Sequence, residues 1–387
     1  MPKFKTLMNR KNISILLIAI FFTSLLIACY SLSNEKPKPN DESGFFIGID
    51  VAYDDEEGIK NLIDEVSPYT NLFLLGSTGI IRNSTKLNEI IHYLYDKNLH
   101  FIIYEENRRY LDTVSLVQEK LGNKFLGLEY EDEAGGAQLD VRSYRPVTEA
   151  ANWSEAANQF VAALGAYLNQ ALDTLHPAPT DFHLFTADYA LYWFDYKAGY
   201  DVVLAEFGWN YSRQLNVALC RGAATALNRE WGVIVTWTYE TPPYIESGDQ
   251  LYQDLIIAYE NGAKYILVFD SNREYTEGIL QHEHFDALKR FWQYKENNPR
   301  NSNQNSNQNS NRIAYVLPKD YAYGFRGPND KIWGLWEADD FSLEISRNLG
   351  ILLTQYENML DIIYDDEIAL DATYGKYIFW NNTVYVP

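Results

Sequence analysis

Strand-like and helix-like segments alternate along residues 45–293, and this alternation limits the folds open to the chain. Eight apolar runs are each followed by a segment with helical spacing or by an aromatic turn. Strands that alternate with helices form a parallel sheet, and eight units in about 250 residues predict a closed (β/α)8 barrel, the TIM barrel. An open doubly wound sheet is the alternative, but no G-x-G-x-x-G turn follows the first run. The expected strands are 45–53, 71–77, 100–106, a run from 124, 181–187, 201–209, 232–240 and 264–270, and the expected helices are 55–66, 86–96, 110–121, one from 152, 189–196 (helix or turn), 212–228, 250–260 and 284–293.

The fourth run, Lys124–Gly136, passes directly into four carboxylates and a Gly-Gly pair. On a strand, alternate side chains share a face, so Glu129 and Glu131 would lie on one side, together with Glu133 if the strand continues that far. Clustered carboxylates raise one another's pKa values, and tuned carboxylates are the groups that cleave glycosidic bonds. A solvated acidic loop is the simpler alternative. Residues 134–151 show no periodicity and are expected to form the longest loop.

Acidic residues recur where the predicted strands end, and this end of a barrel carries the active site. Seven of the eight runs close on a carboxylate, whereas the run interiors are mostly apolar. Exposure of strand ends to solvent explains one or two such acids but not their recurrence. The acids are Asp50, Glu105, Glu106, Glu129, Glu131, Asp132, Glu133, Asp188, Glu206, Glu240 and Asp270, and the aromatic residues expected in the same layer are Trp209, Trp237, Tyr239 and Tyr244.

The composition favours a sugar ligand and disfavours nucleic acid. The chain has 387 residues, a formal net charge of −21 and an aromatic share of 15%, with 30 Tyr and 9 Trp. An acidic body repels phosphate backbones and anionic headgroups, so a neutral or cationic ligand is expected. Aromatic faces can stack on sugar rings, although Tyr-rich surfaces also serve general packing.

Other chemistries have little support in the sequence, and we expect no metal and no cofactor. No H-E-x-x-H, P-loop, G-x-S-x-G or calcium-loop motif is present. His282 and His284 could bind a metal, but capping or surface roles are favoured because they begin a predicted helix. Cys220 lies in an apolar helical pattern and is expected to be a buried small side chain.

Residues 1–29 have the pattern of an export signal. Basic residues up to Lys11 precede an apolar run, 13–28, that ends in Leu-Ile-Ala-Cys29. This ending resembles the lipobox of prokaryotic lipoproteins, and the resemblance implies a lipid on Cys29 that tethers the protein to a membrane outside the cytoplasm. An uncleaved anchor is the alternative, but it needs a longer apolar span. Residues 30–43 would then form a polar spacer.

A polar repeat divides the rest of the chain. Residues 298–311 consist mainly of Asn, Ser and Gln and predict a linker, which assigns 44–297 to the barrel. Residues 312–387 contain strand-like runs around one helical segment, 341–357, and predict a small α/β module.

Residues 44–297 resemble the catalytic barrel of retaining glycoside hydrolases with a (β/α)8 fold. In that superfamily an acid/base glutamate follows strand four and a nucleophilic glutamate follows strand seven, which correspond to Glu133, with Glu131 as the near alternative, and Glu240. Glu206 on strand six is a further candidate partner. Where the superfamily has Asn-Glu, this sequence has Asp132-Glu133. The tract 313–336 is similar to one in uncharacterised archaeal and bacterial hydrolase-like proteins, and the module resembles a shortened flavodoxin-like domain that follows some β-galactosidase barrels.

The sequence therefore predicts a surface-tethered protein that hydrolyses O-glycosidic bonds of a glycan. Glu133 would donate the proton, and Glu240 or Glu206 would attack or activate water. A non-catalytic glycan-binding lipoprotein on the same barrel is one alternative, and a two-lobed solute-binding lipoprotein of a transporter is another. The residues expected to bind the sugar are Asp50, Asp132, Trp209, Trp237, Tyr239, Tyr244 and Asp270.

Overall fold

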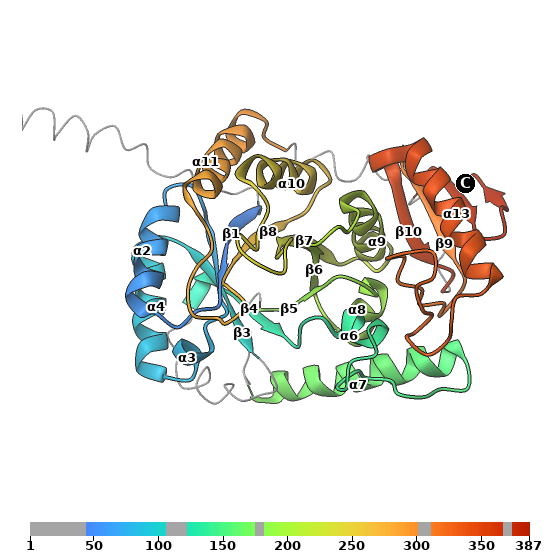
Figure 1. The fold of residues 1–387 in the computed structure, drawn as a ribbon, viewed down its shortest axis with the longest axis horizontal. Coiled ribbons are helices and arrows are strands. Elements are labelled where there is room, and N and C mark those ends of the chain that lie inside the picture. The colour runs from blue at the N-terminus through green and yellow to red at the C-terminus, as the bar shows by residue number, and fades with distance from the viewer. Residues whose placement is uncertain (1–43, 106–121, 175–181, 301–310, 367–373) are drawn as a thin grey trace, which may run out of the picture. The chain divides into compact units, whose positions relative to one another are not determined.

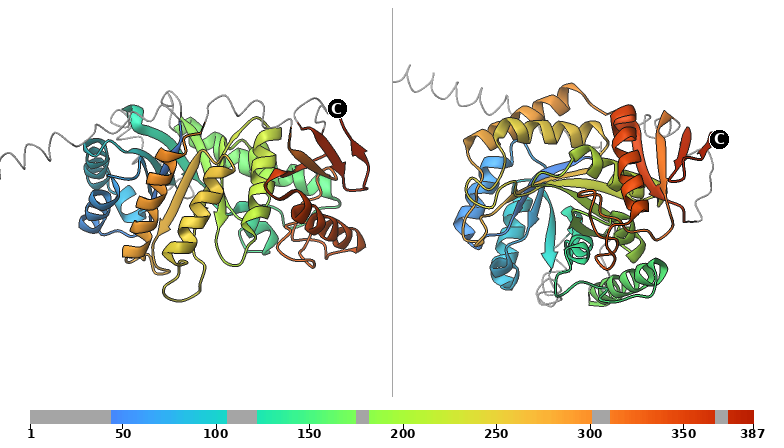
Figure 2. Two further views of the ribbon diagram at one scale, coloured as in Figure 1. Left: turned by 90° about the horizontal axis from the view of Figure 1, so that it is seen from above. Right: turned by 45° about the vertical axis from the view of Figure 1, so that its right-hand side comes forward.

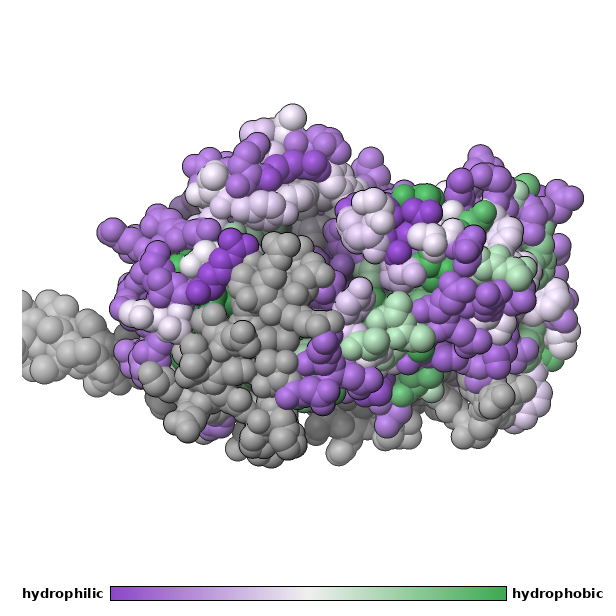
Figure 3. Space-filling view, turned by 90° about the horizontal axis from the view of Figure 1, so that it is seen from below, coloured by the Kyte–Doolittle hydropathy of each residue, from purple (hydrophilic) through white to green (hydrophobic). Residues whose placement is uncertain are grey.

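The computed structural model describes residues 44–105, 122–174, 182–300, 311–366 and 374–387. The predicted helix 110–121, the leader with Cys29, the spacer and most of the polar linker lie outside these residues. Within the described ranges, no helix is both long and apolar enough to cross a bilayer. Among the coloured residues in Figure 3, hydrophilic ones predominate, with small hydrophobic patches between them.

Eight parallel strands form a closed barrel, in which each strand pairs with the next and β8 returns to pair with β1 (Figure 1). The predicted (β/α)8 fold is therefore confirmed. Closure excludes both the open doubly wound sheet and the two-lobed solute-binding architecture. The strands are β1 (Phe46–Val51), β2 (Leu72–Leu75), β3 (His100–Glu105), β4 (Phe125–Tyr130), β5 (His183–Asp188), β6 (Val202–Phe207), β7 (Glu230–Val235) and β8 (Tyr265–Asp270).

Helices surround the barrel (Figures 1 and 2), and longer ones such as α2 and α4 present one apolar stripe to the core. In α2 this stripe consists of Ile59, Leu62, Ile63 and Val66, the four residues predicted from their spacing. The helices and short 3-10 turn of this part are α2 (Glu56–Val66), α3 (Thr78–Ile81), α4 (Ser84–Asp96), η1 (Gly122–Lys124), α6 (Ala134–Leu139), α7 (Trp153–Thr174), α8 (Tyr192–Ala198), α9 (Arg213–Ala226), α10 (Gly248–Glu260) and α11 (His282–Asn297).

Two predicted structural roles outside the strands are confirmed. The Nδ1 atom of His284 accepts a hydrogen bond from the Gln281 N–H at 2.8 Å, which caps α11. His282 is exposed and lies 3.1 Å from Asp286. Cys220 is fully buried in α9 as a free thiol.

The strands bury side chains on both faces, since alternate residues point inward and outward. Outward-facing side chains pack against the helices in the main core. Inward-facing side chains form a second core that fills the barrel and closes its amino-terminal end below the site. Its buried members are Leu72, Leu74, Ile102, Phe185, Ala187, Val202, Leu204, Ile234, Tyr265 and Leu267.

The C-terminal part is a four-stranded sheet in the order β10-β9-β11-β12, with β12 antiparallel at the edge. It forms one compact unit with the barrel, and its strand β10 lies beside α9 (Figure 1). The Arg221 guanidinium of α9 donates to Asp361 of β10 at 2.7 Å, and both side chains are buried. The elements are β9 (Ile313–Leu317), α13 (Asp340–Tyr356), η3 (Glu357–Met359), β10 (Leu360–Tyr364), β11 (Lys376–Phe379) and β12 (Val384–Tyr385).

Three predicted element boundaries are wrong, and each error lies near the carboxyl end of a strand. Strand β4 stops at Tyr130, so Glu131 and Glu133 are not on it, and residues 134–139 form the helix α6 instead of a loop. Strand β7 stops at Val235. Beyond it, the N–H groups of Thr238 and Tyr239 both bond to the Tyr244 carbonyl in a turn, so the chain leaves the sheet before Glu240.

Candidate active site

The last inward-facing residues of the strands form the floor of a cavity of about 750 Å³ at the carboxyl ends of the barrel. On every strand except β1 and β4, the floor residue lies two positions after a buried residue of the barrel core. Three are acidic, two are aromatic and three are small, which leaves room above them for a ligand. In strand order from β1 to β8 they are Asp50, Gly76, Tyr104, Glu129, Ala187, Glu206, Thr236 and Phe269.

The three acids of the floor, Asp50, Glu129 and Glu206, are 6%, 3% and 5% exposed. Burial raises the pKa of each carboxyl well above its ordinary value, and negative neighbours add to this effect. After burial, the negative charge of Glu133 is the largest cause of the raised pKa of Glu206. All three acids follow from the strand-end pattern in the sequence.

Glu133 approaches the cavity from the turn between β4 and α6. Its φ of 51° is left-handed, a backbone conformation that non-glycine residues adopt rarely and mostly where the surroundings enforce it. Its N–H donates to the Ala187 carbonyl of β5 at 2.7 Å. Burial and the charge of Asp132 raise the pKa of Glu133 to about 7, although the Arg142 guanidinium at 3.4 Å opposes the shift.

The turn that carries Glu133 is fixed by Asp188 at the end of β5. Its carboxylate accepts hydrogen bonds from the N–H groups of Gly135 and Gly136 at 2.5 and 2.9 Å. These glycines are required for close approach, because a Cβ at Gly136 would lie 2.0 Å from the Tyr189 ring and one at Gly135 would lie 2.4 Å from the Ala190 carbonyl oxygen. Asp188 therefore has a positioning role at the site.

A polar network connects this turn to the C-terminal part of the chain. Arg142 lies 3.5 Å from Asp140, whose carboxylate also accepts a hydrogen bond from the Tyr189 hydroxyl at 2.7 Å. Arg326 from the segment after β9 pairs with the same carboxylate and with Asp330. Asp140, which lines the cavity, is therefore bound by Arg326, a residue from outside the barrel.

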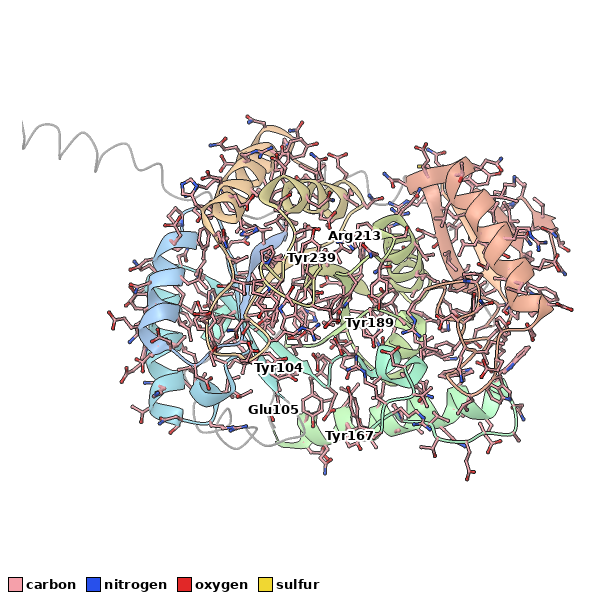
Figure 4. All side chains as sticks on the ribbon, viewed as in Figure 1. Tyr104, Glu105, Tyr167, Tyr189, Arg213 and Tyr239 are labelled. Carbon is pink, nitrogen blue, oxygen red and sulfur yellow. The ribbon has the colours of Figure 1, made fainter. Side chains whose placement is uncertain are left out.

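Aromatic side chains also line the cavity. Arg273 lies between the rings of Trp209 and Trp237, with its guanidinium carbon 5.2 and 5.0 Å from their centroids. The rings of Tyr189 and Tyr211 stack at 5.8 Å and 15°. Figure 4 labels Tyr104 and Tyr189, whose side chains come from two different strand ends. Aromatic rings that line a cavity can stack on the apolar faces of sugars.

Most of the predicted site residues line this cavity, but not all of them. Glu240 lies at its rim, with a 75% exposed side chain 3.2 Å from Arg273. The Asp270 carboxylate holds the β8–α11 loop by accepting from the N–H groups of Ile279 and Leu280. The predicted residues that line the cavity are Asp50, Asp132, Glu133, Glu206, Trp209, Trp237 and Glu240, and those that do not are Glu131, Tyr239, Tyr244 and Asp270.

Several lining residues were not predicted from the sequence. The two arginines, Arg142 and Arg273, lie in connections after β4 and β8, and a cation in such a connection is a weak signal on its own. Asp54, Asp140, Tyr144, Tyr189, Tyr211 and Tyr275 also line the cavity. Among the described residues, no group of three or more His, Cys, Asp or Glu side chains could hold a metal ion.

The fold and the site define a (β/α)8 barrel with an acidic, aromatic-walled cavity at the carboxyl ends of its strands. The chain matches no known protein family and no curated protein. Among solved structures, a β-galactosidase from the psychrophilic Marinomonas ef1 is similar, with a TM-score of 0.57 and 10% identity over 86% of this chain and 72% of that one.

Other solved structures include a β-glucosidase from Thermotoga maritima in complex with deoxynojirimycin, with a TM-score of 0.44 and 9% identity over 64% and 97% of the two chains. A catalytic module of a pneumococcal exo-β-D-N-acetylglucosaminidase has a TM-score of 0.40 and 14% identity over 69% of this chain and 88% of that one. At such identities, the likeness to the β-galactosidase shows that the barrel fold is shared.

Proposed function

We propose that this chain is a glycoside hydrolase that cleaves O-glycosidic bonds of a glycan in the barrel cavity. The main support is that Glu133 and Glu206 reach one cavity from different elements, between aromatic walls. A carboxyl pair of this kind can hold one proton, because the negative charge of Glu133 raises the pKa of Glu206 and so disfavours ionisation of both groups together. One member can then act as an acid while the other acts as a base or nucleophile.

In this proposal Glu133 donates the proton to the leaving oxygen, and Glu206 attacks the anomeric carbon or activates water. Glu133 is only partly buried, at the mouth of the cavity, where a leaving group would depart. Glu206 lies at the floor, beneath the ring of the sugar that reacts. A lipid on Cys29 that tethers the protein outside the cytoplasm belongs to the same proposal and is supported by the N-terminal pattern alone.

Replacing Glu133 by glutamine should lower turnover of a cleaved glycan by about 10²–10⁴-fold, because the amide cannot donate the proton. Release of reducing ends from a panel of polysaccharides identifies the glycan and measures the effect. An aryl glycoside with a good leaving group needs little proton donation and should lose far less activity. Unchanged turnover in this variant would rule out Glu133 as the acid. Binding of a glycan without cleavage by the wild-type protein would favour the non-catalytic alternative.

The alkaline limb of the pH profile tests the role of Arg142. Glu133 must be protonated to act as an acid, so activity should fall as the pH rises through its pKa of about 7. Arg142 lowers that pKa, so Arg142→Gln should move the alkaline limb to higher pH. Arg145→Gln, a nearby charge change outside the cavity lining, should leave the limb in place. A shift to lower pH in Arg142→Gln would contradict the assignment.

A further inference from the structure

Two carboxylates on the cavity floor, Asp50 of β1 and Glu129 of β4, are not used by the proposed catalytic pair. Both line the cavity and are more than nine-tenths buried. The Oδ1 atom of Asp50 is buried, and in the part of the chain that the structure describes no hydrogen-bond partner reaches it. A buried polar atom without a partner costs free energy, so a cation held at the Asp50 carboxylate from the cavity would offset part of that cost.

The charged side chains that shift the pKa values of these two groups are all negative. Asp132, which accepts a hydrogen bond from Tyr104 at 3.2 Å, and Asp270 both add to the effect of burial in raising the pKa of Asp50. Asp50 and Asp132 do the same for Glu129. Asp132 therefore raises the pKa values of both Asp50 and Glu129.

The two arginines that line the cavity are bound to other groups. Arg142 contacts Glu133 and Asp140. Arg273 lies between two tryptophan rings and pairs with Glu240. Neither arginine is among the causes of the pKa shifts at Asp50 and Glu129.

A cationic group on the ligand would compensate these charges. A buried carboxylate is costly to ionise without a cation, and an ammonium group supplies both a positive charge and three N–H donors. Charge-assisted hydrogen bonds of this kind are about twice as strong as neutral ones. The aromatic walls would meanwhile contact the faces of the sugar rings.

We infer that the substrate is a glycan containing amino sugars with free amino groups, and that Asp50 and Glu129 bind the ammonium group of one such sugar. This inference rests on the proposed function, since it names the substrate class of the same cavity. It assigns a binding role, distinct from the chemistry of Glu133 and Glu206.

Binding to matched oligosaccharides tests this inference directly. Calorimetry would use the Glu133→Gln protein with glucosamine and galactosamine tetrasaccharides and their N-acetylated counterparts. At least one free-amine ligand should bind about ten-fold or more tightly than its N-acetylated form. Asp50→Asn should abolish this preference, whereas Glu274→Gln, an exposed charge change on the β8–α11 loop, should preserve it. Equal affinity for the two forms would overturn the inference.

The pH dependence separates an ammonium ligand from a neutral sugar hydroxyl. If protonated Asp50 and Glu129 receive an ammonium group, binding releases protons, and affinity should rise with pH until the pH reaches the raised pKa values of these carboxyls. If these groups remain protonated and donate to hydroxyls, affinity should fall as they ionise, which would refute the inference. Cleavage of only neutral or N-acetylated glycans would also refute it and leave the hydrolase proposal intact. Free-amine binding without cleavage of any glycan would support the subsite and refute hydrolysis.

Discussion

Replacing Glu206 by glutamine should lower kcat on the cleaved glycan by about 10²–10⁴-fold, the range typical of a lost catalytic carboxylate. The side chain faces the cavity from β6 and is 5% exposed, so its environment is fixed by the barrel. Glutamine has the same shape but neither attacks the anomeric carbon nor accepts a proton from water. Because burial raises the pKa of Glu206, the neutral amide should be tolerated without loss of the fold, which circular dichroism can verify.

Glu240→Gln is the matched control, because the resemblance to retaining hydrolases places the nucleophile at that position. Its exposed side chain lies five residues beyond the end of β7 and pairs with Arg273, so we expect a loss of less than about ten-fold. A larger loss in Glu240→Gln than in Glu206→Gln would transfer the role to Glu240. An aryl glycoside with a good leaving group also distinguishes the role of Glu206 from that of Glu133. Its cleavage should remain slow in Glu206→Gln but not in Glu133→Gln.

The fold could be predicted from local pattern alone. The apolar positions of α2 and the eight apolar runs predict the helices and strands to within a few residues. Because the connections between them are short, a closed parallel barrel is the simplest arrangement of these elements. The floor acids could also be predicted, because Asp50, Glu129 and Glu206 occupy inward positions two residues beyond buried ones.

The upper part of the site could not be predicted in this way, because contacts between distant residues shape it. Glu133, not Glu131, lines the cavity because β4 ends early and Asp188, more than 50 residues later, fixes the turn. Arg326 reaches Asp140 from outside the barrel. Such contacts leave no periodic signal in the sequence.

A buried ion pair connects the barrel to the C-terminal sheet. The Arg221 Nε atom donates to Asp361, one Nη donates to the Asn261 side chain at 2.6 Å, and the other donates to the Asn358 and Leu360 carbonyls. Asp361 is fully buried, and its second oxygen lies 3.6 Å from Arg312. Removing Arg221 would leave a buried carboxylate with one distant cation and several acceptors without donors.

Arg221→Met should therefore destabilise the protein by about 3–5 kcal/mol, the usual cost of breaking a buried ion pair by removing one partner. Arg229→Met removes an exposed pair with Asp201, formed at a similar distance of 2.7 Å, and should cost at most about 1 kcal/mol. Urea unfolding followed by tryptophan fluorescence measures both changes. A second substitution, Asp361→Leu, should recover part of the loss, since it removes the uncompensated charge. Equal effects of the two arginine substitutions would mean that the buried pair does not stabilise the contact between the barrel and the C-terminal sheet.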